Sequence, residues 1–169
     1  MIYLSGVNYE SINDAEGVSC VLFVSGCKHC CKGCHSPNTH NFTYGTPVTE
    51  DLVTTIKAEI NKRPFLKTIV LSGGDCMYSP TETLDLLKKV KEHKFQVWCY
   101  TGFTFEELIQ DEEQLKLLKE IDVLVDGPFD MTKRDITLAF RGSTNQRIID
   151  VKTSLKEGTL VLYGNYNKL

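Results

Sequence analysis

Four cysteines and three histidines lie within one stretch of sixteen residues, SGCKHCCKGCHSPNTH, at positions 25–40. Thiolate and imidazole groups bind transition metals, and thiolates also carry redox chemistry and iron–sulfur clusters. The stretch therefore raises four possibilities: a zinc site, a redox dithiol, a disulfide framework, or the ligands of an iron–sulfur cluster.

The spacing of the cysteines separates these possibilities. Read as pairs, they form Cys27-x2-Cys30 and Cys31-x2-Cys34, with no chain between the pairs. Zinc ribbons bring such pairs from segments roughly 15 to 20 residues apart, so this arrangement disfavours zinc without excluding it. A redox dithiol uses one pair and leaves the other unexplained. A two-cluster ferredoxin run needs a cysteine where this sequence has Gly33. The register that remains is Cys27-x3-Cys31-x2-Cys34.

Composition and charge indicate the class of protein. The 169 residues, 41% hydrophobic and 24% charged, predict one domain, 1–169, with a sizeable core. A net charge of −3 with scattered Lys and Arg predicts no nucleic-acid partner. Because the chain shows no signal-peptide pattern and no apolar run of roughly 18 residues, we expect a cytoplasmic protein without a membrane partner. In a reducing cytosol, seven cysteines are expected to be ligands or reactive groups rather than disulfides.

Short apolar runs alternate with helical patterns along the chain. The runs occupy 18–24, 67–72, 95–100, 121–126 and 147–151, with a further candidate strand at 159–163. Each is bounded by Gly or Asp, as is typical of strands buried on both faces of a parallel sheet. The alternation predicts an α/β fold with a mostly parallel sheet. Ligands bind at the carboxyl ends of such strands, so we expect the site in the loops that follow them.

Three helices are expected between these strands. The segment 49–63 carries apolar residues on one helical face, and Ser79-Pro80-Thr81-Glu82 predicts a capping box with proline at the first helical position. Thr104 to Glu107 predicts a second capping box, and the acidic segment 110–114 in the helix that follows is expected to face solvent.

The C-x3-C-x2-C register resembles the signature of the radical S-adenosylmethionine enzymes, which follows the first strand of their barrel. By that resemblance, Cys27, Cys31 and Cys34 ligate three irons of a [4Fe-4S] cluster, and the amino and carboxylate groups of S-adenosylmethionine chelate the fourth. The reduced cluster then cleaves this cofactor to methionine and a 5'-deoxyadenosyl radical. Many members have an aromatic residue before the last cysteine, where this sequence has Gly33.

Nearly the whole chain resembles one family within that group, the anaerobic ribonucleoside-triphosphate reductase-activating proteins. The stretches that carry the resemblance are GVSCVLFVSGCKHCCKGCHSPNTH, TIVLSGGDCMYSP, VWCYTGFTFEEL, IDVLVDGPF and FRGSTNQRIIDVK. It implies a short, open partial (β/α) barrel of five or six strands. It also implies that the protein abstracts a hydrogen from a C-terminal glycine of the large reductase subunit, with a low-potential electron donor such as flavodoxin.

The same resemblance implies which residues bind S-adenosylmethionine. The backbone of Gly33, Cys34 and His35 faces the adenosyl group, and the turn Ser72-Gly73-Gly74-Asp75 approaches the methionine amino group. Further candidates are Thr101, Asp126 and Arg141; a structural salt bridge is the alternative for Arg141. Glycines at the turn let a ligand approach the backbone, so Gly74→Val is expected to weaken cofactor binding and to spare the cluster.

The other cysteines and the histidines receive simpler interpretations. Cys20 and Cys99 lie in apolar strands and are expected in the core. Cys30 is either a spectator beside the cluster or a thiol that binds the open iron when the cofactor is absent, and Cys76 has no assigned ligand role. The polar loop groups in this interpretation are His29, His35 and His40. Alternative functions are activation of another glycyl-radical enzyme of the formate-lyase type, small-molecule radical chemistry, and a non-enzymatic zinc- or cluster-binding module.

Overall fold

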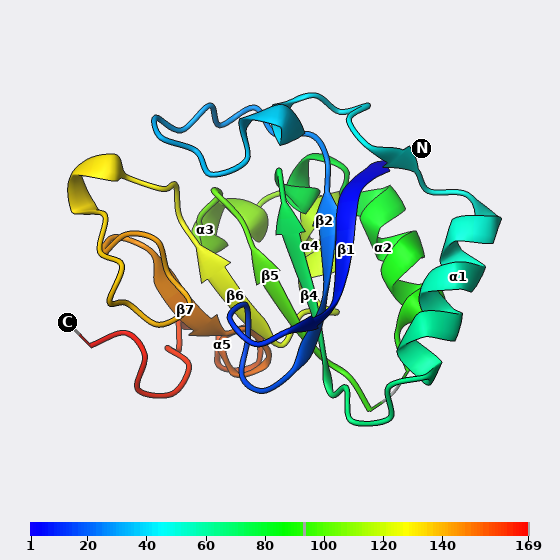
Figure 1. The fold of residues 1–169 in the computed structure, drawn as a ribbon. Helices are drawn as coiled ribbons and strands as arrows, with labels where there is room; N and C mark the ends of the chain where they lie inside the picture. The colour runs from blue at the N-terminus through cyan, green and yellow to red at the C-terminus, as the bar shows by residue number, and fades with distance from the viewer. Residues whose placement is uncertain (93, 169) are drawn as a thin grey trace.

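A seven-stranded mixed sheet forms the centre of the protein (Figure 1). The structure is a computed structural model, and it describes residues 1–92 and 94–168. The strands are β1 Tyr3–Ser11, β2 Ser19–Val24, β3 Thr46–Pro47, β4 Thr68–Gly73, β5 Gln96–Tyr100, β6 Val123–Asp126 and β7 Arg147–Asp150. Their order across the sheet is β3-β1-β2-β4-β5-β6-β7. The four central strands β2, β4, β5 and β6 are parallel.

The predicted α/β fold with a mostly parallel centre is confirmed, and the sheet edges differ from expectation. The first strand, β1, was not predicted because its sequence YLSGVNYES mixes polar and apolar residues, as suits a strand with one partly exposed face. The last strand, β7, pairs antiparallel with β6, so the parallel series ends there. The candidate strand 159–163 forms only a single bridge, between Leu162 and Ile149. The sheet is not closed into a barrel, and β3 and β7 are its edges.

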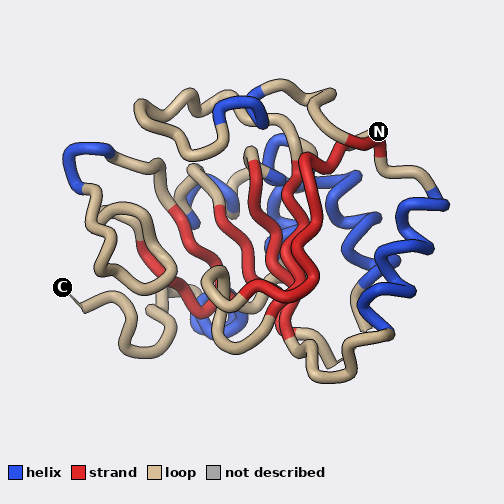
Figure 2. The backbone as a smooth tube through the Cα atoms, viewed as in Figure 1, coloured by secondary structure: helices blue, strands red, loops and turns tan. Residues whose placement is uncertain are grey.

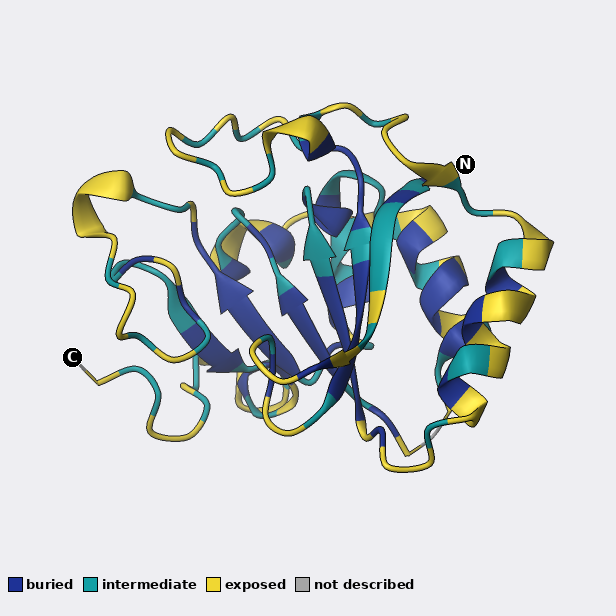
Figure 3. Ribbon diagram, viewed as in Figure 1, coloured by how far each residue is buried: buried dark blue, intermediate teal, exposed yellow. Residues whose placement is uncertain are grey.

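Five α-helices cover one face of the sheet. They are α1 Glu50–Asn61, α2 Pro80–Val90, α3 Phe105–Leu108, α4 Glu112–Leu118 and α5 Val151–Glu157. Each helix contributes apolar side chains to one continuous core with the sheet; the best buried are Ile56, Leu87, Leu108, Leu117 and Val151. Figure 3 shows buried and exposed residues alternating along α1 and α2, whose buried residues belong to this core.

The helix starts follow the predicted chemistry in part. Thr104 and Glu107 form the expected capping box at α3. Proline begins α2 as predicted, but the Ser79 side chain makes no capping hydrogen bond, so the first predicted capping box is wrong. The predicted third helix is divided into α3 and α4. A new helix begins after Asp111, whose side chain accepts hydrogen bonds from the Glu113 and Gln114 amides. The acidic segment around Asp111 is exposed, as expected.

Loops and the C-terminal segment cover the other face of the sheet. A second core there centres on Trp98, with Val21, Val70, Val123 and Ile148 around it. Its cover includes Ala15 from the loop after β1, and the rings of Phe140, Tyr163 and Tyr166 pack against it. The five helices therefore lie on one side of the sheet, and loops cover the other.

The carboxyl ends of the parallel strands share one edge of the sheet, and long loops gather there (Figure 2). The loop after β2 arches over this edge and contains the short 3-10 helix η1, Pro37–His40. The turn after β4 leads into η2, Cys76–Tyr78, and the connection from β6 to β7 contains η3, Met131–Lys133. In the described part of the chain, no helix has the length and apolar character needed to cross a membrane.

Candidate functional site

A cavity of about 590 Å³ lies at this edge of the sheet, between the loops that follow β2, β4, β5 and β6. Predicted site residues that line it are Cys27, Cys31, Gly33, Cys34, His35, Ser72, Gly73, Gly74, Asp75, Thr101 and Arg141. A wider depression of about 750 Å³ lies beside it along 131–144, but no cysteine or histidine lines that depression. The chemistry therefore points to the first cavity.

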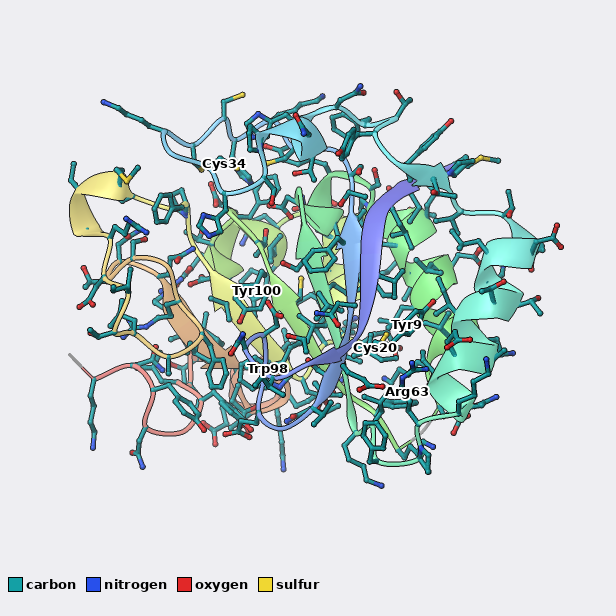
Figure 4. The ribbon with its side chains drawn as sticks, in the orientation of Figure 1. Tyr9, Cys20, Cys34, Arg63, Trp98 and Tyr100 are labelled. Carbon is teal, nitrogen blue, oxygen red and sulfur yellow. The ribbon has the colours of Figure 1, made fainter. Side chains whose placement is uncertain are left out.

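The segment 25–40 after β2, called the cysteine loop below, has three thiols on the cavity and one in solvent. Cys27, Cys31 and Cys34 line the cavity and are partly buried, whereas Cys30 is exposed and has a backbone φ of 49°. Figure 4 places Cys34 on the loop over the strand ends, above Tyr100 at the end of β5. The three thiols on the cavity are those of the C-x3-C-x2-C register.

The three thiols suit a cluster better than a single metal ion. Among the described residues, no group of three His, Cys, Asp or Glu side chains converges as one metal ion would require. Structural zinc needs four ligands around one point, whereas each thiolate of a cubane cluster binds a different iron. Burial raises the pKa of the Cys27 thiol to about 11. Cluster binding must therefore displace a proton from this thiol.

The Gly-Gly-Asp turn after β4 packs directly against the cysteine loop. The Gly74 amide donates to the carbonyl oxygen of Val24 (2.7 Å), and the Asp75 amide donates to that of Gly26 (2.9 Å). A Cβ at Gly74 would lie 2.8 Å from the carbonyl oxygens of Gly26 and Thr39. The close approach that requires glycine here is therefore made by the protein's own backbone. Gly74→Val would disturb the cysteine loop as well as any ligand, which corrects the expectation that it spares the cluster.

Asp126 does not line the cavity, and its contacts are with other parts of the protein. Its buried carboxylate accepts from the Phe105 amide (2.8 Å) and from Arg147 Nε (2.9 Å). Arg147 also pairs with Glu106 at 2.7 Å. These contacts tie the end of β6 to the start of α3 and to β7, and they occupy the carboxylate that was predicted to bind the cofactor.

Arg141 brings a buried positive charge to the cavity. Only 7% of the residue is exposed, and its guanidinium donates to the backbone oxygens of Gln146 (2.9 Å) and Tyr166 (3.1 Å). Its buried Nε has no hydrogen-bond partner, and within the described residues Arg141 makes no ion pair. The salt bridge considered as its alternative role is therefore not formed. A guanidinium that lines a cavity and has no ionic partner suits an anionic group.

Two buried thiols meet behind the site. Cys20 and Cys99 lie in the core as predicted, and Cys76 lies there too, with its Sγ 3.4 Å from Cys99 Sγ. The Cys76 thiol and burial both raise the pKa of Cys99. Sequence alone could not pair these residues, because they lie on different strand ends.

His29 is the residue that the sequence analysis underestimated. Interpreted there as a polar loop group, it lines the cavity, and its Nε2 lies 2.8 Å from Asp75 Oδ2. Its ring also packs edge-on against Phe103. No local signal marks this contact, because the two residues are 46 positions apart.

Comparison with known proteins supplies the family. A family model described as a 4Fe-4S single cluster domain matches residues 13–149, which defines the class of protein to which this fold and cysteine-lined cavity belong. A Vibrio cholerae protein is 40% identical over 140 residues, covering 80% of this chain and 89% of its own length. A Pasteurella multocida protein is 38% identical, covering 81% of this chain and 90% of its own length. An Escherichia coli K12 protein is 36% identical, covering 80% of this chain and 90% of its own length. All three are named anaerobic ribonucleoside-triphosphate reductase-activating proteins, and this chain belongs to that family.

Proposed function

We propose that this protein activates an anaerobic ribonucleoside-triphosphate reductase by generating a glycyl radical on its large subunit. The observation that carries the proposal is the placement of three thiols, in C-x3-C-x2-C register, on one cavity of a chain in this family. The protein would act in the cytoplasm and draw electrons from a low-potential donor such as flavodoxin.

In this proposal, Cys27, Cys31 and Cys34 hold a [4Fe-4S] cluster and leave one iron for S-adenosylmethionine. When bound, the cluster supplies the electron that cleaves the cofactor to methionine and a 5'-deoxyadenosyl radical. The exposed Cys30 takes no part in ligation. The fold is interpreted as an open member of the radical S-adenosylmethionine type, since its helices cover one face and its parallel strands end at the cavity.

The remaining cavity residues orient the cofactor. The backbone of 33–35 faces its adenosyl group, and the turn 72–75 presents backbone oxygens to its amino group. Arg141, which lines the cavity and makes no ion pair among the described residues, receives its carboxylate. Thr101 lines the wall between these groups.

The cavity rim suits a substrate that arrives as part of another protein. Met131 and Ile136 line the cavity and are 43% and 83% exposed, so the cavity opens to solvent on that side. Small ligands are usually enclosed over 70–90% of their surface. A glycine-bearing loop of the reductase would both deliver the hydrogen atom and close the opening.

The test is an anaerobic mixture of reconstituted protein, S-adenosylmethionine, dithionite and the large reductase subunit, examined by electron paramagnetic resonance. We expect an organic radical doublet on the reductase that collapses when its glycine is deuterated at the α-carbon. A doublet that survives deuteration, or no radical on the reductase, would contradict the proposal. A radical formed instead on a formate-lyase type enzyme would identify a different target.

A further inference from the structure

We infer that His29 is a positioning residue: its bond to the buried Asp75 carboxylate sets the place of the cysteine loop over the cavity. The inference rests on the proposed cluster ligation and assigns a role to two side chains that lie outside the ligand triad. It also gives Asp75 a structural role, as the residue that joins the cavity walls.

Asp75 joins the loops that follow three neighbouring strands. Its Oδ2 accepts from His29 Nε2 (2.8 Å), Thr101 Oγ1 (2.9 Å) and the Gly102 amide (2.9 Å). Its Oδ1 accepts from the Met77 amide (3.0 Å). The donors come from the cysteine loop after β2, the turn after β4 and the turn after β5.

The Asp75 carboxylate is committed mainly to the cavity walls. Three of its four protein donors share Oδ2, and the fourth reaches Oδ1. Its side chain is 2% exposed, so solvent supplies no further partner. The protein's own donors therefore hold this carboxylate in place across the three loops.

The His29 ring is held in one orientation by its surroundings. Its centroid lies 4.6 Å from that of Phe103 and 5.1 Å from that of Tyr78, and the Tyr78 hydroxyl lies 3.5 Å from Nδ1. A Cβ at Gly102 would lie 2.5 Å from the ring, so glycine is required there for the ring to approach. Because the carboxylate accepts at Nε2, that nitrogen carries the proton.

The contact between His29 and Asp75 matters because of where His29 lies in the sequence. It lies between Cys27 and Cys31, within the segment that must place two thiolates at different corners of one cluster. Among the described residues, the other contacts that tie residues 27–34 to the protein include a backbone hydrogen bond from the Cys27 amide to the His40 carbonyl oxygen (3.5 Å) and the Lys28 ammonium over the Phe42 ring. Groups outside the ligand shell that fix a ligand's orientation typically contribute about 10- to 100-fold to metal affinity.

The experiment compares His29→Phe with His29→Gln in the full-length protein, reconstituted anaerobically. Phenylalanine keeps the ring against Phe103 and removes the donor, whereas glutamine restores an N–H near the place of Nε2. The matched control is Lys32→Ala, an exposed side chain on the same loop. The readouts are the rate of iron loss to a chelator and the change that S-adenosylmethionine causes in the resonance spectrum of the reduced cluster.

We expect His29→Phe to lose iron about tenfold faster and to need about tenfold more S-adenosylmethionine for the spectral change. His29→Gln and Lys32→Ala should stay close to the unsubstituted protein, and circular dichroism should show all apoproteins folded. Equal iron retention and an equal spectral response in His29→Phe would overturn the inference. So would a glutamine variant as impaired as the phenylalanine one, because restoring the donor to Asp75 would then rescue nothing. Failure of the unsubstituted protein to take up a cluster would instead overturn the proposed function, and this inference with it.

Discussion

At the scale of single residues, position within the cysteine loop separates three thiols from a fourth. Cys27, Cys31 and Cys34 line the cavity, and Cys30 is exposed with its backbone in the left-handed region. Adjacent cysteines in a sequence can therefore face different environments, because one residue of unusual φ redirects the chain.

Serine substitutions test this division of the cysteines. Replacing Cys27, Cys31 or Cys34 with serine should prevent a stable [4Fe-4S] cluster, because an open cluster has no spare protein ligand. Cys30→Ser should retain iron and sulfide contents close to those of the unsubstituted protein after anaerobic reconstitution. Loss of the cluster in Cys30→Ser, to the extent seen for the triad, would show that the register is wrong.

At the scale of elements, the turn after β4 and the loop after β2 behave as one unit. Backbone hydrogen bonds from Gly74 and Asp75 reach the start of the cysteine loop. Below them, Asp126 and Arg147 connect β6, β7 and the start of α3. The cavity walls are thus joined by contacts that do not involve any ligand.

Gly74→Ala tests the packing of turn against loop. The added methyl would crowd two backbone oxygens at 2.8 Å, so we expect the free energy of unfolding to fall by about 1 to 3 kcal/mol. Iron uptake should fall with it. Urea denaturation of the reduced apoprotein measures the first effect. Gly6→Ala is the control, since its Cβ would meet only Phe23 at 4.0 Å, and equal stability of the two variants would contradict the packing argument.

The Asp126 link gives a second prediction at this scale. Asp126→Ala leaves the Phe105 amide without its acceptor and removes a buried partner of Arg147, so it should destabilise the apoprotein by about 3 kcal/mol. Glu106 is the other partner of Arg147, and the Glu106 side chain is 58% exposed. Glu106→Ala should therefore lower the free energy of unfolding by at most about 1 kcal/mol. Thermal or urea unfolding compares them. Similar losses for both variants would show that burial does not decide the strength of this pair.

At the scale of the whole molecule, the sheet ends in two open edges and the cavity opens beside the connection from β6 to β7. The exposed Met131 and Ile136 lie on that side. Chemistry that needs protection from water is therefore completed by a partner in the proposed function.

Cofactor turnover should depend on that partner. With dithionite as the reductant, release of 5'-deoxyadenosine should rise at least about tenfold when the large reductase subunit is added, equivalent to about 1.4 kcal/mol of barrier. Chromatography of acid-quenched samples measures the product. An unrelated protein at the same concentration is the control. Turnover as fast without the subunit as with it would argue for a small-molecule substrate.

Periodicity and spacing within short segments were enough to predict the central strands and the starts of α1, α2 and α3, and to suggest the cysteine register. The family resemblance that rested on those motifs is confirmed by the relatives. Local patterns also placed most candidate residues on strand ends, and strand ends in a parallel sheet meet at one edge.

Which groups meet across that edge could be read from the three-dimensional structure alone. Asp75 accepts from His29, Gly74 packs on the cysteine loop, and Cys76 lies against Cys99. The strand β1 and the antiparallel direction of β7 were likewise settled by their neighbours. The physical reason is the same in each case: these contacts join segments far apart along the chain, and the energy that selects them comes from burial and hydrogen bonding between segments, which no short stretch of sequence contains.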